Sequence, residues 1–177
     1  AGYVVGLVAS QITKSNVVGF IGGMDIPSCS NFSVGFEKAM KEINPNSKTL
    51  IQFTNSFTDS AKAKVIAKQM KNNGADIIFT ACGGGNVGVI ETAREEKDIK
   101  IIGVDMPMSY MSPEYIITSA LKNVGEGLKL TIKDTLEGNF NGGKEVKYDL
   151  SNNGVGYEKT DLLSDEVIEF VDKKIEK

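Results

Sequence analysis

The sequence contains no histidine, and this absence excludes several kinds of active site. Without an imidazole there can be no Ser-His-Asp or Cys-His nucleophile pair, no histidine ligand for zinc and no histidine proton shuttle near neutral pH. Catalysis would have to use carboxylates, lysines, tyrosines or cysteines. The missing histidine therefore favours a protein that binds a ligand over an enzyme, and neither a metal site nor a cofactor is expected.

Cysteines and long apolar runs are also scarce. Cys29 and Cys82 are too few for a disulfide framework and too widely spaced for a metal motif, so both are predicted to be free thiols. No apolar run reaches the roughly 20 residues of a membrane span, and residues 1–6 lack the basic n-region of a signal peptide. The protein is therefore expected to be cytosolic, or to have had its targeting segment removed before this chain begins.

Positive charge is not in excess either. The 20 basic residues, which are lysines except for Arg94, face 23 acidic residues, and the formal net charge is −3. A nucleic-acid-binding surface requires a clustered positive excess. The composition therefore predicts no nucleic-acid partner.

What the 177 residues do contain is an alternation of short apolar runs with amphipathic runs, which is typical of βαβ units around a parallel sheet. Hydrophobic residues at 41% and charged residues at 24% match an ordinary globular domain. Strands are predicted over 17–21, 49–53, 76–81, 100–104 and 115–121, and helices over 1–14, 30–43, 60–74, 85–98, 125–138 and 164–177. Residues 144–150 also look strand-like, and a polar stretch follows at 151–161. The expected fold class is α/β: a three-layer Rossmann-like lobe with a mainly parallel five-stranded sheet.

The loops that follow the predicted strands are the expected place for a ligand, because open parallel sheets bind ligands at the carboxyl ends of their strands. Phe57 interrupts a polar loop there, either as a lid over the core or as a stacking surface for a planar ligand. Asp105 can accept hydrogen bonds from two sugar hydroxyls, or it can cap a turn. Lys122 ends the next strand, where its ammonium can point to solvent or pair with Asp105. An aromatic plate, this charged pair and a glycine-rich turn together indicate a nucleoside.

The glycine-rich turn also admits an enzymatic interpretation. Gly83, Gly85 and Gly88 fit the dinucleotide fingerprint G-x-G-x-x-G after a strand, and Asp105 ends the next strand about where a ribose-binding acid belongs. That fingerprint normally follows the first strand of its sheet, whereas two βα units precede it here. A nucleotide- or dinucleotide-binding enzyme domain therefore stays an alternative. The glycines can also bring a backbone close to another ligand, or make a tight turn and nothing more.

Seven segments in order along nearly the whole chain carry a resemblance to a known family. They are residues 19–24, 55–62, 74–79, 83–84, 102–105, 118–122 and 154–157. In these segments the chain resembles the basic membrane protein (BMP) family, the substrate-binding lipoproteins of ABC transporters that include a purine nucleoside receptor. The resemblance implies a fold like that of the type I periplasmic binding proteins, with two lobes that close on a nucleoside. It also implies an exported, membrane-anchored protein that delivers its ligand to a membrane permease.

The resemblance assigns a role to each candidate residue. Phe57 would stack on the base, Asp105 would hold the ribose hydroxyls, and Lys122 would supply the ammonium beside it. Gly83 and Gly84 would provide backbone donors near the sugar. The predicted function is thus the nucleoside-binding component of an ABC uptake transporter.

The resemblance also predicts how the chain is divided. Family members are about twice as long, so the chain resembles a C-terminal lobe whose lipidated cysteine and partner lobe lie outside it. Residues 1–14 would form an inter-lobe helix at the margin, 15–140 the ligand-binding lobe, and 141–177 a hinge-side strand with the C-terminal helix. The apolar stripe of the first helix and the open crevice would favour self-association of the isolated lobe. Because receptor lobes also serve as effector domains, a ligand-sensing domain of a regulator is the other alternative.

Overall fold

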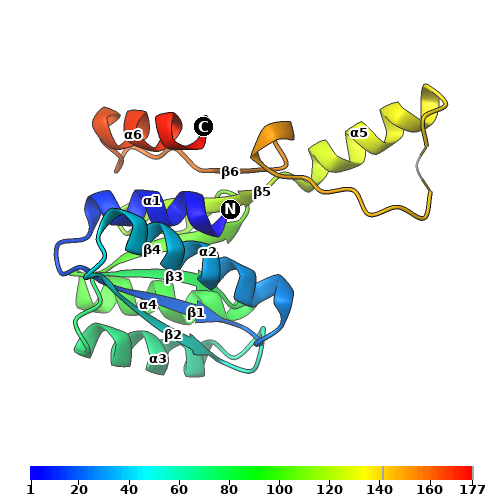
Figure 1. The fold of residues 1–177 in the computed structure, drawn as a ribbon. Coiled ribbons are helices and arrows are strands. Elements are labelled where there is room, and N and C mark those ends of the chain that lie inside the picture. Colours follow the sequence, from blue (N-terminus) through cyan, green and yellow to red (C-terminus); the bar gives the residue numbers. More distant parts are fainter. Residues whose placement is uncertain (141, 177) are drawn as a thin grey trace.

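A computed structural model describes residues 1–140 and 142–176. Its strands form one sheet in the order β2-β1-β3-β4-β5-β6 (Figure 1). The strands are β1 Val17–Gly22, β2 Lys48–Phe53, β3 Ile77–Ala81, β4 Lys100–Asp105, β5 Ile116–Lys122 and β6 Val155–Tyr157. The helices are α1 Gly2–Ile12, α2 Pro27–Ile43, α3 Ser60–Asn72, α4 Asn86–Glu96, α5 Val124–Leu136 and α6 Asp165–Ile175. Strands β1 to β5 run parallel, and β6 pairs antiparallel with β5. The α/β fold class is confirmed, with a sixth strand.

Two hydrophobic clusters, one on each face of the sheet, make the three layers. The first joins α1, α2 and α6 to the sheet and contains the aromatic side chains Phe20, Phe32, Phe36 and Phe79. The second joins α3 and α4 to the opposite face. Because β2 and β3 lie on opposite sides of β1, the strand order reverses there and leaves a crevice at the carboxyl ends of the strands.

Helix α1 belongs to the core rather than to the margin. Val4, Leu7 and Val8 are buried in it, and the helix packs closely on α2. A Cβ at Gly6 would lie 2.7 Å from the Phe36 carbonyl oxygen, so the close approach requires glycine there. The apolar stripe of this helix is therefore covered within the chain and is not open for the self-association expected from it. The role of α1 between two lobes stays a prediction.

The sixth strand is not where the strand-like pattern lies. Residues 144–150 alternate in polarity, but they have no neighbouring strand and form none. The ladder is made instead by Val155–Tyr157, which pairs with Ala120–Lys122 of β5. The prediction of a strand at 144–150 is wrong because a strand needs a sheet edge to pair with, which no local pattern reveals. Residues 141 and 177, the bounds of the predicted last segment, lie outside the described residues.

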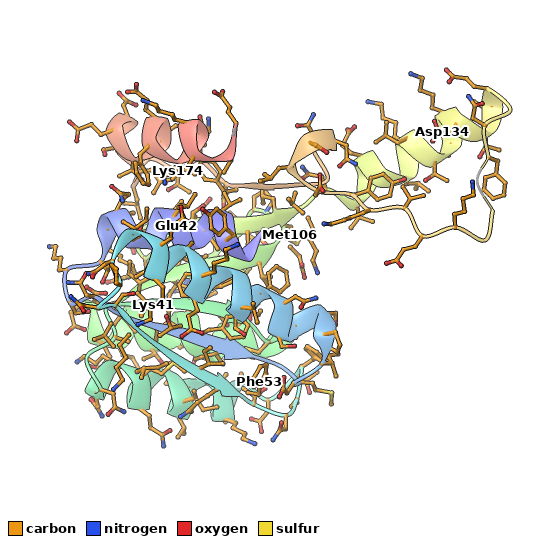
Figure 2. The ribbon with its side chains drawn as sticks, in the orientation of Figure 1. Lys41, Glu42, Phe53, Met106, Asp134 and Lys174 are labelled. Carbon is orange, nitrogen blue, oxygen red and sulfur yellow. The ribbon has the colours of Figure 1, made fainter. Side chains whose placement is uncertain are left out.

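Helix α5 projects from the lobe, and the chain returns beside it (Figure 1). Figure 2 shows Asp134 on this projecting helix. Its apolar side is open, since Leu128, Ile132 and Leu136 are 62%, 51% and 83% exposed. Tyr148 is its main neighbour, with its hydroxyl 2.9 Å from that of Thr131. The amphipathic pattern correctly predicted a helix, but it did not show that the lobe leaves this face uncovered.

Helix ends follow local signals in part. The Asp59 side chain accepts a hydrogen bond from the Lys62 N–H at 2.9 Å, and Gly74 adopts a left-handed φ of +93° after α3. Both were expected. Helix α2 begins at Pro27, three residues before the predicted start at residue 30, since proline fits the first turn of a helix. This earlier start brings the first turn of α2 to the carboxyl end of β1.

Candidate ligand-binding site

A cavity of about 170 Å³ lies at the carboxyl ends of the strands. Phe57, Gly83, Asp105 and Lys122 line it, so the fold brings together four of the five predicted site residues. Ser28, Cys29, Phe32, Ala81 and Val104 complete its wall. The site thus combines an aromatic ring, a carboxylate, an ammonium group and exposed backbone, contributed by loops far apart in the sequence.

Phe57 is seated on glycine backbone. A Cβ at Gly23 would lie 2.2 Å from the ring, and a Cβ at Gly83 would lie 2.7 Å from the Phe57 carbonyl oxygen. Phe57 nevertheless remains 40% exposed. The ring therefore rests against the protein and keeps part of its surface free for a planar partner, which aromatic side chains bind by stacking.

A polar network holds the loop that carries Phe57. The buried Thr54 hydroxyl donates to the Ser56 carbonyl oxygen at 2.5 Å and lies 3.2 Å from the Gly23 carbonyl oxygen. The Ser56 hydroxyl accepts from the N–H groups of Thr58 and Asp59, each at 3.1 Å. These bonds fix the backbone on both sides of Phe57, so the ring is presented by a rigid loop.

Gly84 supports the same loop. Its N–H donates to the Phe57 carbonyl oxygen at 2.8 Å. It is not part of the cavity wall, in contrast to Gly83, whose φ of +60° lies in the left-handed region that favours glycine. In this conformation Gly84 acts on the site through Phe57. Its predicted role as a donor to the sugar would require that bond to be shared.

Asp105 and Lys122 face each other across adjacent parallel strands. The Lys122 Nζ lies 3.4 Å from the Asp105 Oδ1, and the two side chains are 41% and 59% exposed. Such an exposed pair contributes only about 0–1 kcal/mol to folding. Asp105 also has a φ of +67°, which is uncommon for a residue other than glycine. Backbone in this region persists where its surroundings hold it, often at functional sites.

Phe32, which the sequence analysis did not single out, belongs to the core cluster and also lines the cavity. The Lys122 Nζ lies 4.5 Å from the centre of its ring, within reach of a cation–π contact, and the ring packs edge-on against Phe79. Its spacing from Phe36 along α2 is typical of a helix face that packs on the core, and it does not indicate a ligand site. The proline at position 27 was the available clue, because a helix that begins there places Ser28, Cys29 and Phe32 beside the strand ends.

Both cysteines are buried free thiols, as predicted. Burial raises the pKa of the Cys82 thiol to about 11, so it is neutral at physiological pH. Cys29 lines the cavity and donates to the Ala81 carbonyl oxygen at 3.4 Å. The site therefore offers hydrogen bonds, charge and stacking, but no thiolate nucleophile at Cys82.

The glycines of the dinucleotide fingerprint serve packing. A Cβ at Gly88 would lie 1.9 Å from the Ser60 carbonyl oxygen, so Gly88 allows α4 to approach α3. The Phe57 backbone covers the turn at Gly83 and Gly84. A pyrophosphate would need that space and those N–H groups. The turn is thus built to hold Phe57.

Two larger hollows, of about 1140 and 470 Å³, lie where the projecting segment joins the lobe. Tyr148 and Val155 line both of them. The larger hollow also has aromatic and charged groups, such as Tyr148, Asp149 and Lys147. Ligands of open parallel sheets bind at the carboxyl ends of the strands, so we take the smaller cavity there as the candidate site. Within residues 1–140 and 142–176, no cluster of three or more potential metal ligands is found, and no helix is long and apolar enough to cross a membrane.

The fold and this strand-end site define the class of protein: a substrate-binding lobe of the type I periplasmic-binding-protein kind. A solute-binding protein of an ABC transporter system from Aeropyrum pernix K1 has a similar fold, with a TM-score of 0.77 and 25% identity over 99% of this chain and 56% of that one. A transcriptional activator of the comK gene from Bacillus halodurans gives a TM-score of 0.87 and 26% identity over 99% of this chain and 60% of that one.

The sequence comparisons identify the family. Residues 1–177 match the Bmp family model, described as "ABC transporter substrate-binding protein PnrA-like", and the chain belongs to this family. It is 36% identical over 157 residues to basic membrane protein A of Borreliella afzelii, covering 88% of this chain and 48% of that protein. It is 33% identical over 169 residues to the ABC transporter nucleoside-binding protein BmpA of Lactococcus lactis subsp. cremoris, covering 86% and 48%.

Two conclusions follow from these comparisons. The chain spans about half the length of these relatives. The family consists of substrate-binding proteins for transport and not of enzymes, in agreement with the absence of histidine.

Proposed function

We propose that the chain forms one wall of a nucleoside-binding site, for a purine nucleoside, in the substrate-binding component of an ABC uptake transporter. Phe57 stacks on the base, Asp105 accepts hydrogen bonds from the ribose hydroxyls, and Lys122 holds Asp105 and the sugar oxygens from the adjacent strand. Gly83 and Gly84 provide backbone beside the sugar. A relative described as nucleoside-binding, at 33% identity, supports this choice of ligand class.

The observation that carries the proposal is the convergence of these groups on one cavity. Phe57, Asp105 and Lys122 come from the ends of three different strands, and they offer a flat apolar face next to a charged pair. A nucleoside has the same arrangement, with a planar base joined to a polyol.

The size of the cavity indicates that a second wall is needed. Sites that enclose a small molecule measure about 300–1,000 Å³, whereas this one measures about 170 Å³ and leaves Phe57 and Asp105 partly exposed. Binding also costs several kcal/mol of lost ligand freedom, which a half-covered nucleoside barely offsets. The 177-residue chain by itself should bind nucleosides only in the high-micromolar to millimolar range.

Isothermal titration calorimetry tests the proposal directly. The complete gene product and the 177-residue chain would each be titrated with adenosine, inosine, guanosine, cytidine and uridine. We expect tight binding of at least one purine nucleoside to the complete protein, and weak or undetectable binding to the chain. Micromolar binding to the chain would show that the site is complete within it, and failure of the complete protein to bind any nucleoside would contradict the proposal.

We also propose that the protein works outside the cytoplasm, anchored by a lipid, and passes its ligand to an ABC permease. Curated relatives named basic membrane proteins support a membrane location. Labelling cells with a radioactive fatty acid, followed by fractionation, tests the anchor. Label on the complete gene product in the membrane fraction is expected, and unlabelled protein in the cytosol would contradict it.

A regulatory domain is the second candidate, and one observation favours it. The chain resembles a protein described as a transcriptional activator with a TM-score of 0.87. The complete gene discriminates between the two functions: a signal peptide followed by a lipid-accepting cysteine supports transport, and a DNA-binding helix-turn-helix supports regulation.

A further inference from the structure

Glu158 holds the turn that carries Asp105. It directly follows β6, and its half-buried carboxylate faces the loop after β4. Glu158 Oε2 accepts hydrogen bonds from the Ser119 hydroxyl at 2.7 Å and from the N–H groups of Met108 and Ser109 at 3.1 and 3.4 Å. The Ser109 hydroxyl donates to the other carboxylate oxygen. Two of these donors are in the loop backbone, so the carboxylate fixes the path of the chain.

The backbone of Glu158 is itself anchored to the sheet. Its N–H donates to the Ser119 carbonyl oxygen at 2.9 Å, and its carbonyl oxygen accepts from the Thr118 hydroxyl at 2.7 Å. Both partners belong to β5, the strand that ends at Lys122. Glu158 therefore connects the loop after β4 to the same strand that supplies the other half of the ion pair.

The loop that Glu158 holds starts at Asp105 and returns to the sheet at Met108. Asp105 has a left-handed backbone, and the next N–H, that of Met106, bonds back to the Val104 carbonyl oxygen at 2.8 Å. At Met108 the chain lies against Gly103, where a Cβ would be 2.9 Å from the Met108 Cβ. The short reversal between these two points leaves Asp105 little freedom, provided that Met108 and Ser109 stay in place.

We propose that Glu158 is a positioning residue for Asp105, and through Asp105 for the ribose of the ligand. This role rests on the proposed nucleoside-binding function. Asp105 is more than half exposed and its ion pair with Lys122 is weak, so these contacts alone do not explain its left-handed conformation. Three of the four hydrogen bonds of the Glu158 carboxylate come from Met108 and Ser109 and hold the far end of the turn, and the fourth comes from Ser119 in β5, whose hydroxyl oxygen shares the Met108 N–H. Glu158 determines how well the site recognises ribose hydroxyls without touching the ligand.

The test uses Glu158→Gln in the complete gene product, with Glu169→Gln on the exposed side of α6 as the control. Glutamine keeps the size of the side chain but turns an N–H group toward loop donors that need an acceptor. Calorimetry would measure adenosine and inosine, each beside its 2′,3′-dideoxy analogue, which lacks the hydroxyls that Asp105 is proposed to hold. We expect Glu158→Gln to weaken binding of the parent nucleosides at least tenfold and binding of the dideoxy analogues less than threefold. Glu169→Gln should change neither.

A double variant and a loop variant complete the test. If Glu158 acts through Asp105, then adding Glu158→Gln to Asp105→Asn should cause no further loss, because the two changes remove one interaction. Ser109→Ala removes a partner of the carboxylate on the loop side only. Ser109→Ala should weaken binding less than Glu158→Gln does, again more for the parent nucleosides than for the dideoxy analogues. If Glu158→Gln does not fold, Ser109→Ala by itself tests the role of Glu158.

The outcomes separate this role from the proposed function. If the wild type binds but Glu158→Gln loses equal affinity for parent and dideoxy ligands, or loses none, the role of Glu158 is overturned and the proposed function stands. Additive losses in the double variant also overturn it. A wild type that binds none of adenosine, inosine and guanosine overturns the purine-nucleoside proposal, and the role of Glu158 with it.

Discussion

The ring of Phe57 lies directly on the backbone of Gly23, so that a single methyl group at position 23 would stand 2.2 Å from the nearest ring carbon. Gly23 follows β1 and Phe57 follows β2, the neighbouring strand. The stacking surface is thus placed by the absence of a side chain on an adjacent loop. The segment 19–24 and Phe57 are both noted in the sequence, but no sequence signal pairs Gly23 with Phe57.

Gly23→Ala should displace the Phe57 ring and weaken nucleoside binding in the complete protein. A misplaced ring loses much of the base stacking, worth about 1–3 kcal/mol per base, while the backbone of Gly23 itself can stay in place. In the double variant, the loss of affinity from Gly23→Ala should not add to the loss from Phe57→Ala, because both remove the same stacking contact. Gly125→Ala is the control, because a Cβ there meets nothing within 4 Å. Unchanged affinity in Gly23→Ala would show that Phe57 does not stack on the ligand.

Asp105→Asn and Lys122→Met should each weaken nucleoside binding far more than they weaken folding. Each leaves a polar group of the bound complex without its partner, at a cost of about 1–3 kcal/mol or more for a charged group. The ion pair is exposed, so the free energy of unfolding should change by less than about 1 kcal/mol. Calorimetry and urea denaturation measure the two effects. Affinities within a factor of two of the wild type in both variants would remove these residues from the site.

Asp76→Ala should destabilise the chain without involving the site. Its carboxylate accepts hydrogen bonds from the Thr13 hydroxyl at 2.7 Å and from the N–H groups of Lys14 and Ser15 at 2.6 and 2.9 Å. It fastens the turn between α1 and β1 to the start of β3. Loss of these bonds leaves donors unpaired, at about 1–3 kcal/mol. Urea denaturation measures the loss, with the exposed Asp161→Asn as the control. Equal midpoints for the two variants would refute this account.

The ion-pair cluster between α3 and α4 should make stability depend on pH. Hydrogen bonds from Lys64 and then Lys68 lower the pKa of Glu95 from 4.5 to about 2. A carboxyl whose folded pKa is depressed stabilises the fold above its unfolded pKa, and this contribution is lost as the pH falls through the folded value. The difference in urea midpoint between the wild type and Glu95→Gln should therefore shrink between pH 4.5 and 2. Added salt should reduce it as well, since the pair is exposed. A pH-independent difference would contradict the prediction.

The open side of α5 should make the 177-residue chain self-associate. Exposed apolar side chains that lie together on one helix face favour association in water. Leu136→Glu should lower the average mass measured by light scattering, whereas Val34→Glu, on the exposed face of α2, should not. A wild-type chain that is monomeric at high concentration would contradict this prediction.

The parallel sheet was predictable because its signals are local. Runs such as residues 17–21 and 100–104 are short and apolar, Asp59 and Gly74 mark the ends of α3, and the rule for parallel sheets then selects the loops of the site. Phe57, Asp105 and Lys122 were found in this way. Only the order of the strands in the sheet was then required to show that these three residues lie close together.

Features that depend on distant pairing were not predictable. Strand β6 exists because Val155–Tyr157 meets the edge of β5, and residues 144–150 lack such an edge despite their pattern. The helical spacing of Phe32 with its apolar neighbours in the sequence would be the same whether its ring faced only the core or also the ammonium of Lys122. Glu158 follows a polar stretch, and only the fold shows that it meets Met108 and Ser109.

The projecting segment leaves and re-enters the lobe beside Lys122. The chain departs at Asn123, whose N–H donates to the Gly154 carbonyl oxygen at 2.9 Å and whose side-chain amide reaches the Asn153 carbonyl oxygen at 2.7 Å. Val155 then pairs with Lys122 itself. The two crossings form a double tether, which bends less readily than one strand and resists twisting. Any swing of the segment therefore pivots at Lys122, Asn123 and Val155, beside the candidate ligand-binding site.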